Sequence, residues 1–172
     1  MNRLWGVLVA AMAVVGIVAA GFVAVADDDE DDEEREFRAK LNGYEETPAV
    51  FSTGKGRFRA TLSADGTTLS YTLSYSGLEG TTTLAAHIHF GQEDVAAGVA
   101  AFLCGGGGKP TCPTTSGSVS GTVVAADVIG PTAQGIAPGE FGELLTAMRD
   151  GMTYANVHTN KHPGGEIRGQ ID

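Results

Sequence analysis

The chain has 172 residues, a formal net charge of −10, and only two cysteines and four histidines. No basic patch is evident in the sequence, so we expect neither a nucleic-acid partner nor attachment to anionic lipid headgroups. No phosphate-cradling glycine motif and no G-x-S-x-G nucleophile motif occurs, which argues against nucleotide-dependent and hydrolytic chemistry.

Residues 1–26 have the composition of a secretory signal peptide. Arg3 precedes an uncharged apolar run, and the run ends in Ala24-Val25-Ala26, a small-x-small pattern that predicts cleavage after Ala26. The alternative is an uncleaved membrane anchor, because the run is long enough to span a bilayer. Both alternatives place the rest of the chain outside the cytoplasm, either secreted or in the cell envelope.

Residues 27–36 (DDDEDDEERE) are almost entirely carboxylates. Such a block repels itself, so we expect a disordered, solubilising spacer, or alternatively a weak cation-collecting tail. The remaining residues, 37–172, are numerous enough to bury one core and are predicted to form a single domain.

Short segments with period-two alternation dominate this domain. Apolar, β-branched and aromatic residues alternate with polar ones, and Gly, Asp, Ser and Pro separate the segments, as is typical of strands. About eight such segments predict an all-β sandwich or barrel. The segments are EFRAKLNG, GRFRATL, TTLSYTLSYSGL, TTLAAHIHFG, GVAAFL, SGSVSGTVVAADV, MTYANVHT and GEIRGQI.

The segment PGEFGELLTAMRDG has a different periodicity. Its apolar residues recur at i, i+3, i+4 and i+7, which predicts a short helix with one apolar face, and Gly151 marks its end. We expect this helix to plug one end of the barrel. The residues of the apolar face are Phe141, Leu144, Leu145 and Met148.

Cys104 and Cys112 flank the short glycine-rich segment GGGGKPT. In an exported protein such a close pair is expected to form a disulfide. A metal-ligand role is the alternative, but the spacing fits neither a C-x-x-C motif nor a blue-copper arrangement.

All four histidines lie in two short segments, AAHIHFG and NVHTNKHPGGEIRGQI. Alternate residues of a strand share a face, so His87 and His89 point to one side, and His158 points away from the apolar Val157. If the two strands are neighbours, these imidazoles converge on the barrel exterior, and His162 could fold back over them from the following loop. Convergent neutral imidazoles favour copper or zinc, with iron as a lesser candidate. The alternative is a set of separate surface histidines that fix loops by hydrogen bonds.

Three further polar residues lie near the predicted cluster. Asn156 shares the outward face of its strand with His158, while Glu166 and Arg168 alternate with Ile167 and Ile171. We interpret Arg168 as one partner of a structural ion pair, with Glu166 or with a carboxylate on a neighbouring strand. Alternatively, Glu166, Arg168 and Asn156 support the histidines by fixing their orientation. Arg168 could also attract a small anion toward a bound metal.

These motifs resemble the CHRD domain, named after chordin and also found in bacterial secreted proteins. LNGYEETPAV is similar to the family's opening L-x-G-x-x-E-x-P-P-V, with Ala49 in place of the second proline, and AAHIHFG is similar to A-H-I-H-G. YANVHTNKHPGGEIRGQI is close to the family's Y-V-N-V-H-T-x-x-x-P-x-G-E-I-R-G-Q. The resemblance implies an all-β, immunoglobulin-like barrel, with His87, His89 and His158 on motif positions and His162 at a more variable one.

A looser similarity concerns chemistry. HIHFGQED is similar to the H-V-H-x-F-G-D segment of copper–zinc superoxide dismutases, although the rest of that enzyme's zinc loop is not evident. The first hypothesis is therefore a secreted metal-binding domain, whose strong form is superoxide dismutase-like catalysis; the catalytic residues are not defined by the sequence. The second is a non-catalytic module that binds an extracellular protein, and the third is a structural envelope protein.

Overall fold

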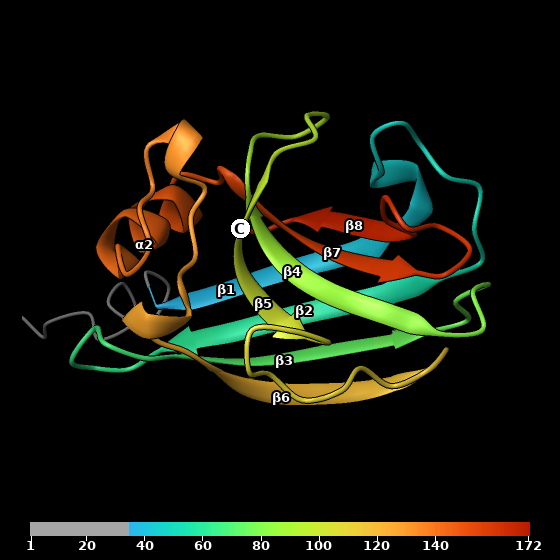
Figure 1. The fold of residues 1–172 in the computed structure, drawn as a ribbon, viewed down its shortest axis with the longest axis horizontal. Helices are drawn as coiled ribbons and strands as arrows, with labels where there is room; N and C mark the ends of the chain where they lie inside the picture. Colours follow the sequence, from blue (N-terminus) through green and yellow to red (C-terminus); the bar gives the residue numbers. More distant parts are fainter. Residues whose placement is uncertain (1–34) are drawn as a thin grey trace, which may run out of the picture.

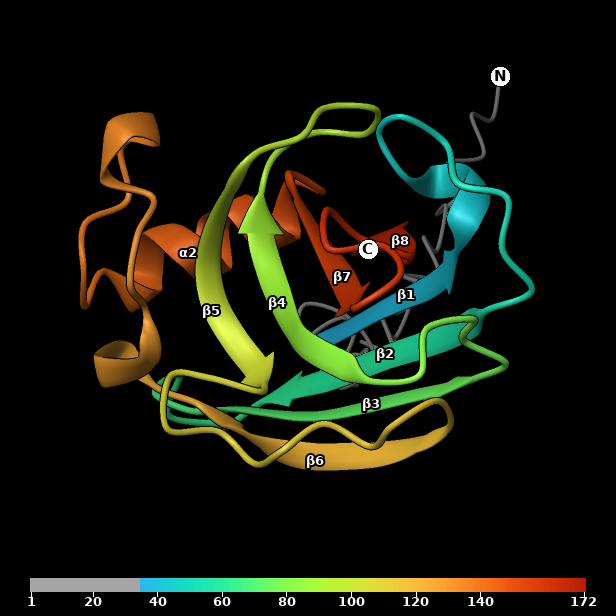
Figure 2. The same cartoon turned by 45° about the vertical axis from the view of Figure 1, so that its right-hand side comes forward.

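The computed structural model describes residues 35–172, which form eight strands and one α-helix. The strands are β1 (Glu36–Asn42), β2 (Lys55–Leu62), β3 (Leu69–Ser76), β4 (Thr83–Phe90), β5 (Gly98–Cys104), β6 (Gly117–Val123), β7 (Thr153–Thr159) and β8 (Ile167–Gln170), and the helix is α2 (Phe141–Arg149). All eight strands belong to one antiparallel sheet with the order β5-β4-β7-β8-β1-β2-β3-β6. The sheet curls into a nearly closed barrel, with α2 at one end (Figure 1, Figure 2), which confirms the predicted fold class.

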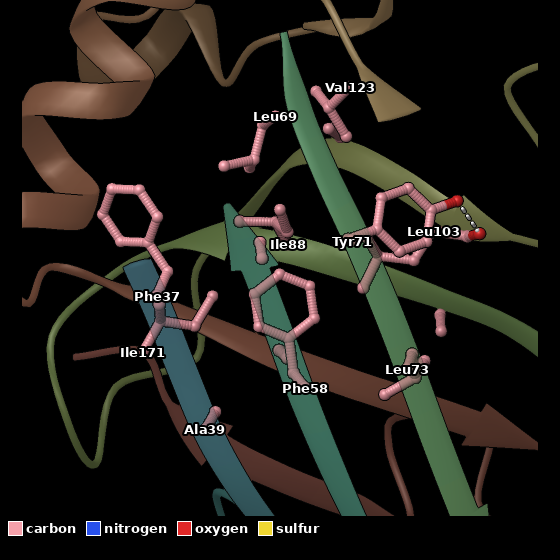
Figure 3. Close-up of a cluster of buried hydrophobic side chains, with 14 of the residues drawn as sticks. Phe37, Ala39, Phe58, Leu69, Tyr71, Leu73, Ile88, Leu103, Val123 and Ile171 are labelled. Atoms are coloured by element: carbon pink, nitrogen blue, oxygen red, sulfur yellow. Dashed lines mark hydrogen bonds between the residues drawn. The ribbon is translucent and has the colours of Figure 1, made fainter. Parts of the chain in front are cut away.

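The core lies inside the barrel because each strand turns its apolar alternate residues inward. Phe58, Leu73 and Ile88 come from three different strands and are completely buried (Figure 3). The apolar face of α2 joins the same cluster, as the sequence predicts. The strand predicted over SGSVSGTVVAADV ends earlier, at Val123, because the Asp127 side chain accepts a hydrogen bond from the Val124 backbone and caps a short 3-10 turn.

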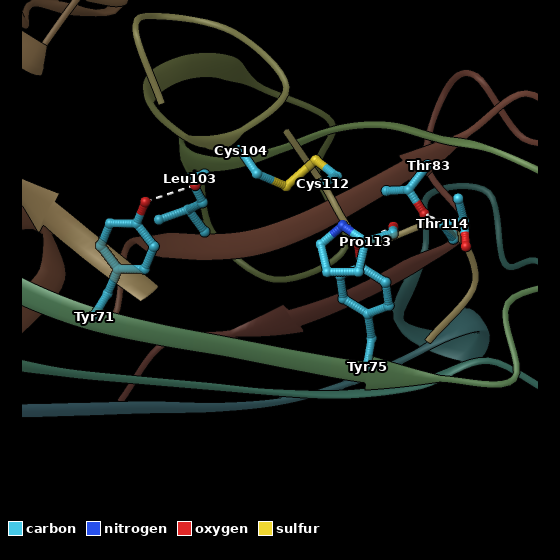
Figure 4. Close-up of a disulfide and its surroundings, with 8 residues drawn as sticks. All are labelled: Tyr71, Tyr75, Thr83, Leu103, Cys104, Cys112, Pro113 and Thr114. Carbon is cyan, nitrogen blue, oxygen red and sulfur yellow. Dashed lines mark hydrogen bonds between the residues drawn. A yellow bond between two sulfur atoms is a disulfide. The ribbon is translucent and has the colours of Figure 1, made fainter. Parts of the chain in front are cut away.

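Backbone hydrogen bonds do not close the barrel: among the described residues, no backbone ladder joins the two edge strands, β5 and β6. We call the boundary between these two strands the seam. Tyrosines on β3 cross this seam from inside. The Tyr71 hydroxyl donates to the Leu103 carbonyl at 2.6 Å, and the Tyr75 hydroxyl donates to the Pro113 carbonyl at 2.6 Å (Figure 4). The predicted disulfide between Cys104 and Cys112 is present and ties the end of β5 to the segment that leads into β6.

The N-terminal predictions fall largely outside the described residues. This applies to the predicted signal segment, residues 1–26, and to the acidic block up to residue 34. Glu36, the last residue of that block, is the first residue of β1. Within residues 35–172, α2 is the only α-helix, and it is too short to cross a bilayer.

The expectation that the chain has no basic patch is wrong. The outward residues of β1 and β2 include five cations, all exposed, which we call the basic face: Arg38, Lys40, Lys55, Arg57 and Arg59. The sequence separates these cations into two strands with apolar residues between them. The antiparallel pairing of β1 with β2 then brings them together on one surface.

Candidate metal centre

Three of the four histidines meet on the outside of the barrel, where β4 and β7 lie side by side in antiparallel register. His87 pairs with Asn156 and His158 pairs with Ala85, so the two strands carry their imidazoles on adjacent rows. The residues between them point inward and are completely buried: Ala86, Ile88, Ala155 and Val157. The two strands are therefore neighbours, which meets the condition under which the sequence predicts converging histidines, and the predicted outward direction of the histidines is confirmed.

We call His87, His89 and His158 the histidine cluster. The ring centroids of His87 and His89 lie 5.3 Å apart, those of His87 and His158 lie 4.9 Å apart, and those of His89 and His158 lie 5.9 Å apart. One nitrogen of each ring lies within 4.8 Å of its counterparts in the other two. These three residues could therefore hold a metal ion between them.

All three imidazoles are held in the neutral form. Burial, assisted by the neighbouring His158 and His89, lowers the pKa of His87 to about 3. Burial also lowers the pKa of His89 to about 4, although its hydrogen bond to the Ala97 carbonyl acts in the opposite direction. The pKa of His158 is lowered as well, again by burial. At neutral pH each ring therefore keeps the lone pair that a metal ion requires.

Backbone carbonyls determine which nitrogen carries that lone pair. Nδ1 of His89 lies 2.9 Å from the Ala97 oxygen, and Nδ1 of His158 lies 3.0 Å from the Pro163 oxygen. A carbonyl oxygen only accepts, so Nδ1 carries the proton in both rings and Nε2 is the free base. Both Nε2 atoms and Nδ1 of His87 are buried, with no hydrogen-bond partner within residues 35–172. Buried polar atoms are rarely left unpaired, so these three nitrogens are the candidate ligands.

Aromatic rings surround the cluster. His89 stacks on Tyr154 of β7, with the ring planes 3° apart and the centroids separated by 4.7 Å. His87 packs edge-on against Phe102 of β5, with centroids 4.5 Å apart. These contacts restrict both imidazoles and contribute to the burial that keeps the rings neutral.

Arg168 contacts the ring of Tyr154, on which His89 stacks, and fixes the loop between β4 and β5. Its guanidinium carbon is 3.5 Å from the centroid of Tyr154, and it donates hydrogen bonds to the carbonyls of Gln92 and Val95 and to the Thr47 hydroxyl. The same loop supplies Ala97, whose N–H donates to the Tyr154 hydroxyl and whose carbonyl accepts from His89. Arg168 is thus buried and committed to holding the segment that orients His89.

Glu46 is the residue that sequence reasoning missed. Its carboxylate is buried, accepts a hydrogen bond from the Asn156 side chain at 2.9 Å, and lies close to Arg168. Burial raises its pKa to about 7 despite these two neighbours. Gly165 lies beside it with a φ of +133°, a backbone conformation that favours glycine, and a Cβ there would also meet the Glu46 carboxylate. The glutamate lies in LNGYEETPAV, so that motif held the signal, but nothing in its local pattern indicates a partner on β7.

Glu166 has a different environment from the one expected. Its carboxylate accepts hydrogen bonds from the Ser52 and Thr159 hydroxyls and from the backbone of Glu79 and Gly80. Burial alone would raise the pKa of Glu166, but these four hydrogen bonds outweigh it and lower the pKa. Its partners lie at the end of β7, in the loop before β4 and in the segment before β2. The expected ion pair with Arg168 is not among its contacts, and Glu46 is the carboxylate that lies near Arg168.

His162 lies in the loop after β7, outside the histidine cluster. Its backbone carbonyl accepts from the N–H groups of Thr159 and Gly165, which closes the turn that presents Pro163 to His158. Its Nε2 is buried without a hydrogen-bond partner in the described part of the chain. The structure thus brings three of the four predicted ligands together, and a role for His162 as a fourth remains a prediction.

The family model described as CHRD domain matches residues 37–171. The matched range contains the histidine cluster, Glu46, Arg168 and both cysteines. Searches of curated proteins and of solved structures return no match.

Proposed function

The chain belongs to the CHRD domain family, and we propose that its histidine cluster binds a transition metal, with copper and zinc as the leading candidates and iron as a lesser one. The observation that carries the proposal is the set of three buried imidazole nitrogens, one per ring, that have no protein partner among the described residues. Their rings are neutral, and their ligand atoms lie within 4.8 Å of one another. A metal ion would satisfy all three at once.

The residues around the cluster prepare it for such an ion. The Ala97 and Pro163 carbonyls hold the protons of His89 and His158 on Nδ1, which leaves Nε2 free. Tyr154 and Phe102 hold two of the rings in place. Bound copper would supply one-electron chemistry, whereas zinc would supply a Lewis acid, and three protein ligands leave a coordination position for a small solute.

The finer form of the proposal is superoxide dismutase-like activity, supported by the similarity of HIHFGQED to the metal-binding segment of those enzymes. Arg168 fits a positioning role better than one of attracting superoxide, because its guanidinium is buried and already donates three hydrogen bonds. We expect any such activity to depend on His87, His89 and His158, and not on direct contact between Arg168 and the anion.

The first experiment is elemental analysis of the untagged protein, purified as exported. We expect about one copper, zinc or iron per chain. The His87→Gln/His89→Gln variant should lose the metal and keep its circular dichroism spectrum. Lys161→Gln, an exposed change in the loop that carries His162, should retain it.

The outcomes separate the candidate ligands and functions. Loss of metal in His158→Gln and retention in His162→Gln would define a three-histidine site, whereas loss in both would add His162 as a fourth ligand. Stoichiometric metal in the double variant, or a wild-type protein that ignores added copper and zinc, would overturn the proposal. The latter result would leave a non-catalytic protein-binding or envelope module. If metal is bound, a superoxide dismutation assay on the copper-loaded protein tests the finer form.

We also propose that the domain acts outside the cytoplasm after removal of residues 1–26. The disulfide supports this location, because such bonds persist in oxidising compartments. N-terminal sequencing of the purified protein tests the cleavage. A sequence beginning at Asp27 is expected, and one beginning within the apolar run would show an uncleaved anchor instead.

A further inference from the structure

The basic face places like charges directly opposite one another. In the register of β1 with β2, Arg38 pairs with Arg59 and Lys40 pairs with Arg57, and all four side chains are exposed. Directly opposed like charges destabilise an antiparallel pair. The chain as a whole is strongly acidic. These opposed cations therefore indicate that a negatively charged group outside β1 and β2 neutralises this surface.

The described part of the chain neutralises this face incompletely. Arg38 has an ion pair with Glu36, and the Lys55 ammonium lies 5.9 Å from the centroid of the Tyr44 ring. Within residues 35–172, Lys40, Arg57 and Arg59 have no ion-pair partner. Four of the five cations line a groove of about 390 Å³, where the acidic neighbours are Glu45 and Asp172. The fifth, Lys55, lines an adjoining hollow next to Ser74.

The complementary charge lies immediately upstream in the same chain. Residues 27–34 are eight consecutive carboxylates, and the chain turns at Arg35 just before β1 begins. Eight extended residues reach roughly 26 Å, whereas the basic face runs from Arg38 to the level of Asn42, which pairs with Lys55, or about 13 Å. The segment is therefore long enough to turn back over the whole face, and its attachment beside β1 makes its effective concentration there high.

We propose that residues 27–34 bind the basic face of their own domain as an intramolecular polyanion. The interaction requires no metal and does not depend on the proposed function of the histidine cluster, because it involves the outer faces of β1 and β2 (Figure 2). It gives the acidic segment a specific partner in place of a purely solubilising role. It also makes the segment a built-in competitor of any external polyanion for this face.

Zero-length carbodiimide cross-linking tests the contact, because it joins carboxylates to lysines that touch them. The protein expressed from the full chain has four lysines, Lys40, Lys55, Lys109 and Lys161. We expect peptides containing residues 27–34 to be joined to Lys40 and Lys55 in the monomer. The Lys161–Glu79 ion pair supplies an internal positive control for the reaction.

The matched variant is Arg38→Gln/Arg57→Gln/Arg59→Gln, which removes three charges and retains both reporter lysines. Cross-links from residues 27–34 should fall several-fold in this variant, and also at about 1 M salt, where the screening length is only ~3 Å. The Lys161–Glu79 product should persist in the variant and shows that the domain remains folded. Cross-links to Lys161 as frequent as those to Lys40, or no effect of the variant, would overturn the proposal.

Cross-linking of a mixture of isotopically light and heavy protein distinguishes binding within one chain from binding between two copies. Mixed light–heavy products would show that the segment binds a second copy, which contradicts the intramolecular assignment. A further measurement uses dextran sulfate as the probe and a variant in which residues 27–34 are replaced by Asn and Gln. That variant should bind the probe at least several-fold more tightly than the wild type, and equal binding would contradict competition for the face.

Discussion

Tyr154 lies between His89 and Arg168, because β7 separates β4 from β8 in the sheet. The His89 ring is parallel to the phenol within 3°, and the Arg168 guanidinium carbon lies 3.5 Å from the centre of the phenol ring. Tyr154 also accepts a hydrogen bond from Ala97, the residue whose carbonyl orients His89. One side chain therefore connects a candidate ligand, the loop that orients it, and the buried cation behind it.

This arrangement predicts that two substitutions of Tyr154 will have different effects on metal affinity. Tyr154→Phe keeps the stack and loses one hydrogen bond, so we expect a loss of about 1 kcal/mol in stability and nearly unchanged metal affinity. Tyr154→Leu removes the flat contact with His89 and should weaken metal binding by roughly 10–100-fold. Competition titration with a chelator measures both affinities. Equal affinities for the two variants would show that the stack does not position His89.

The lowered imidazole pKa values predict how the metal-free protein responds to acid. Folding lowers the pKa from 6.5 to about 3 for His87 and to about 4 for His89. At pH values between these limits the unfolded chain therefore binds more protons than the folded protein. Stability should therefore decrease as the pH falls from about 6.5 toward 4, by on the order of 1.4 kcal/mol per pH unit for each imidazole. Urea denaturation across this range measures the slope.

The control for this prediction is His87→Gln/His89→Gln, whose slope should be shallower. Glu46 acts in the opposite direction, because its pKa is raised from 4.5 to about 7 and its folded form holds the extra proton in that window. The carboxyl group is present in both proteins, so its contribution cancels in the comparison. Identical slopes would show that the imidazoles are not held neutral by the fold.

A substitution of Glu166 tests whether this carboxylate stabilises the fold or supports the metal site. Glu166→Gln replaces a buried carboxylate that accepts four hydrogen bonds, and we expect a loss of about 2–4 kcal/mol in the free energy of unfolding. Metal affinity, measured at a temperature where the variant is folded, should change less than about threefold. A large loss of affinity with normal stability would instead make Glu166 part of the metal site.

Removal of the disulfide should mainly loosen the seam of the barrel. The bond joins residues only eight positions apart, so the Cys104→Ala/Cys112→Ala variant should lose about 2–3 kcal/mol, less than for a longer closed loop. Hydrogen exchange should accelerate in β5 and β6 and remain slow in β1 and β2. Uniform acceleration across the sheet would show that the bond stabilises the whole barrel equally.

The sequence was sufficient for the strands and for the direction of the histidines. Alternation around Ala86 and Ile88 identified the inward face of β4, and the outward position of His87 and His89 followed directly. It could not establish that β7 is the neighbour of β4, because the pairing of strands so far apart in the chain depends on the whole sheet. Glu46 was missed for the same reason, since its partner Asn156 lies more than a hundred residues away.

The basic face was missed for a different reason. Arg38 and Lys40 alternate with buried residues in one segment, and Arg57 and Arg59 do so in another. Alternating cations on two strands joined by one connection could have signalled a shared surface, but the strong acidity of residues 27–36 dominated the overall charge. Net charge is a sum over the chain and does not describe how a sheet sorts charges between its faces.

The open seam also has a consequence for the rate at which ions enter and leave the histidine cluster. β5 is an edge strand held by a single backbone ladder, and that ladder joins it to β4, which carries His87 and His89. Local fraying of β5 would move Phe102 away from His87 without breaking any other ladder of the sheet. Exchange of a bound ion should therefore be controlled by the local opening of one strand, and a barrel with intact global stability could still differ greatly in how long it retains its metal.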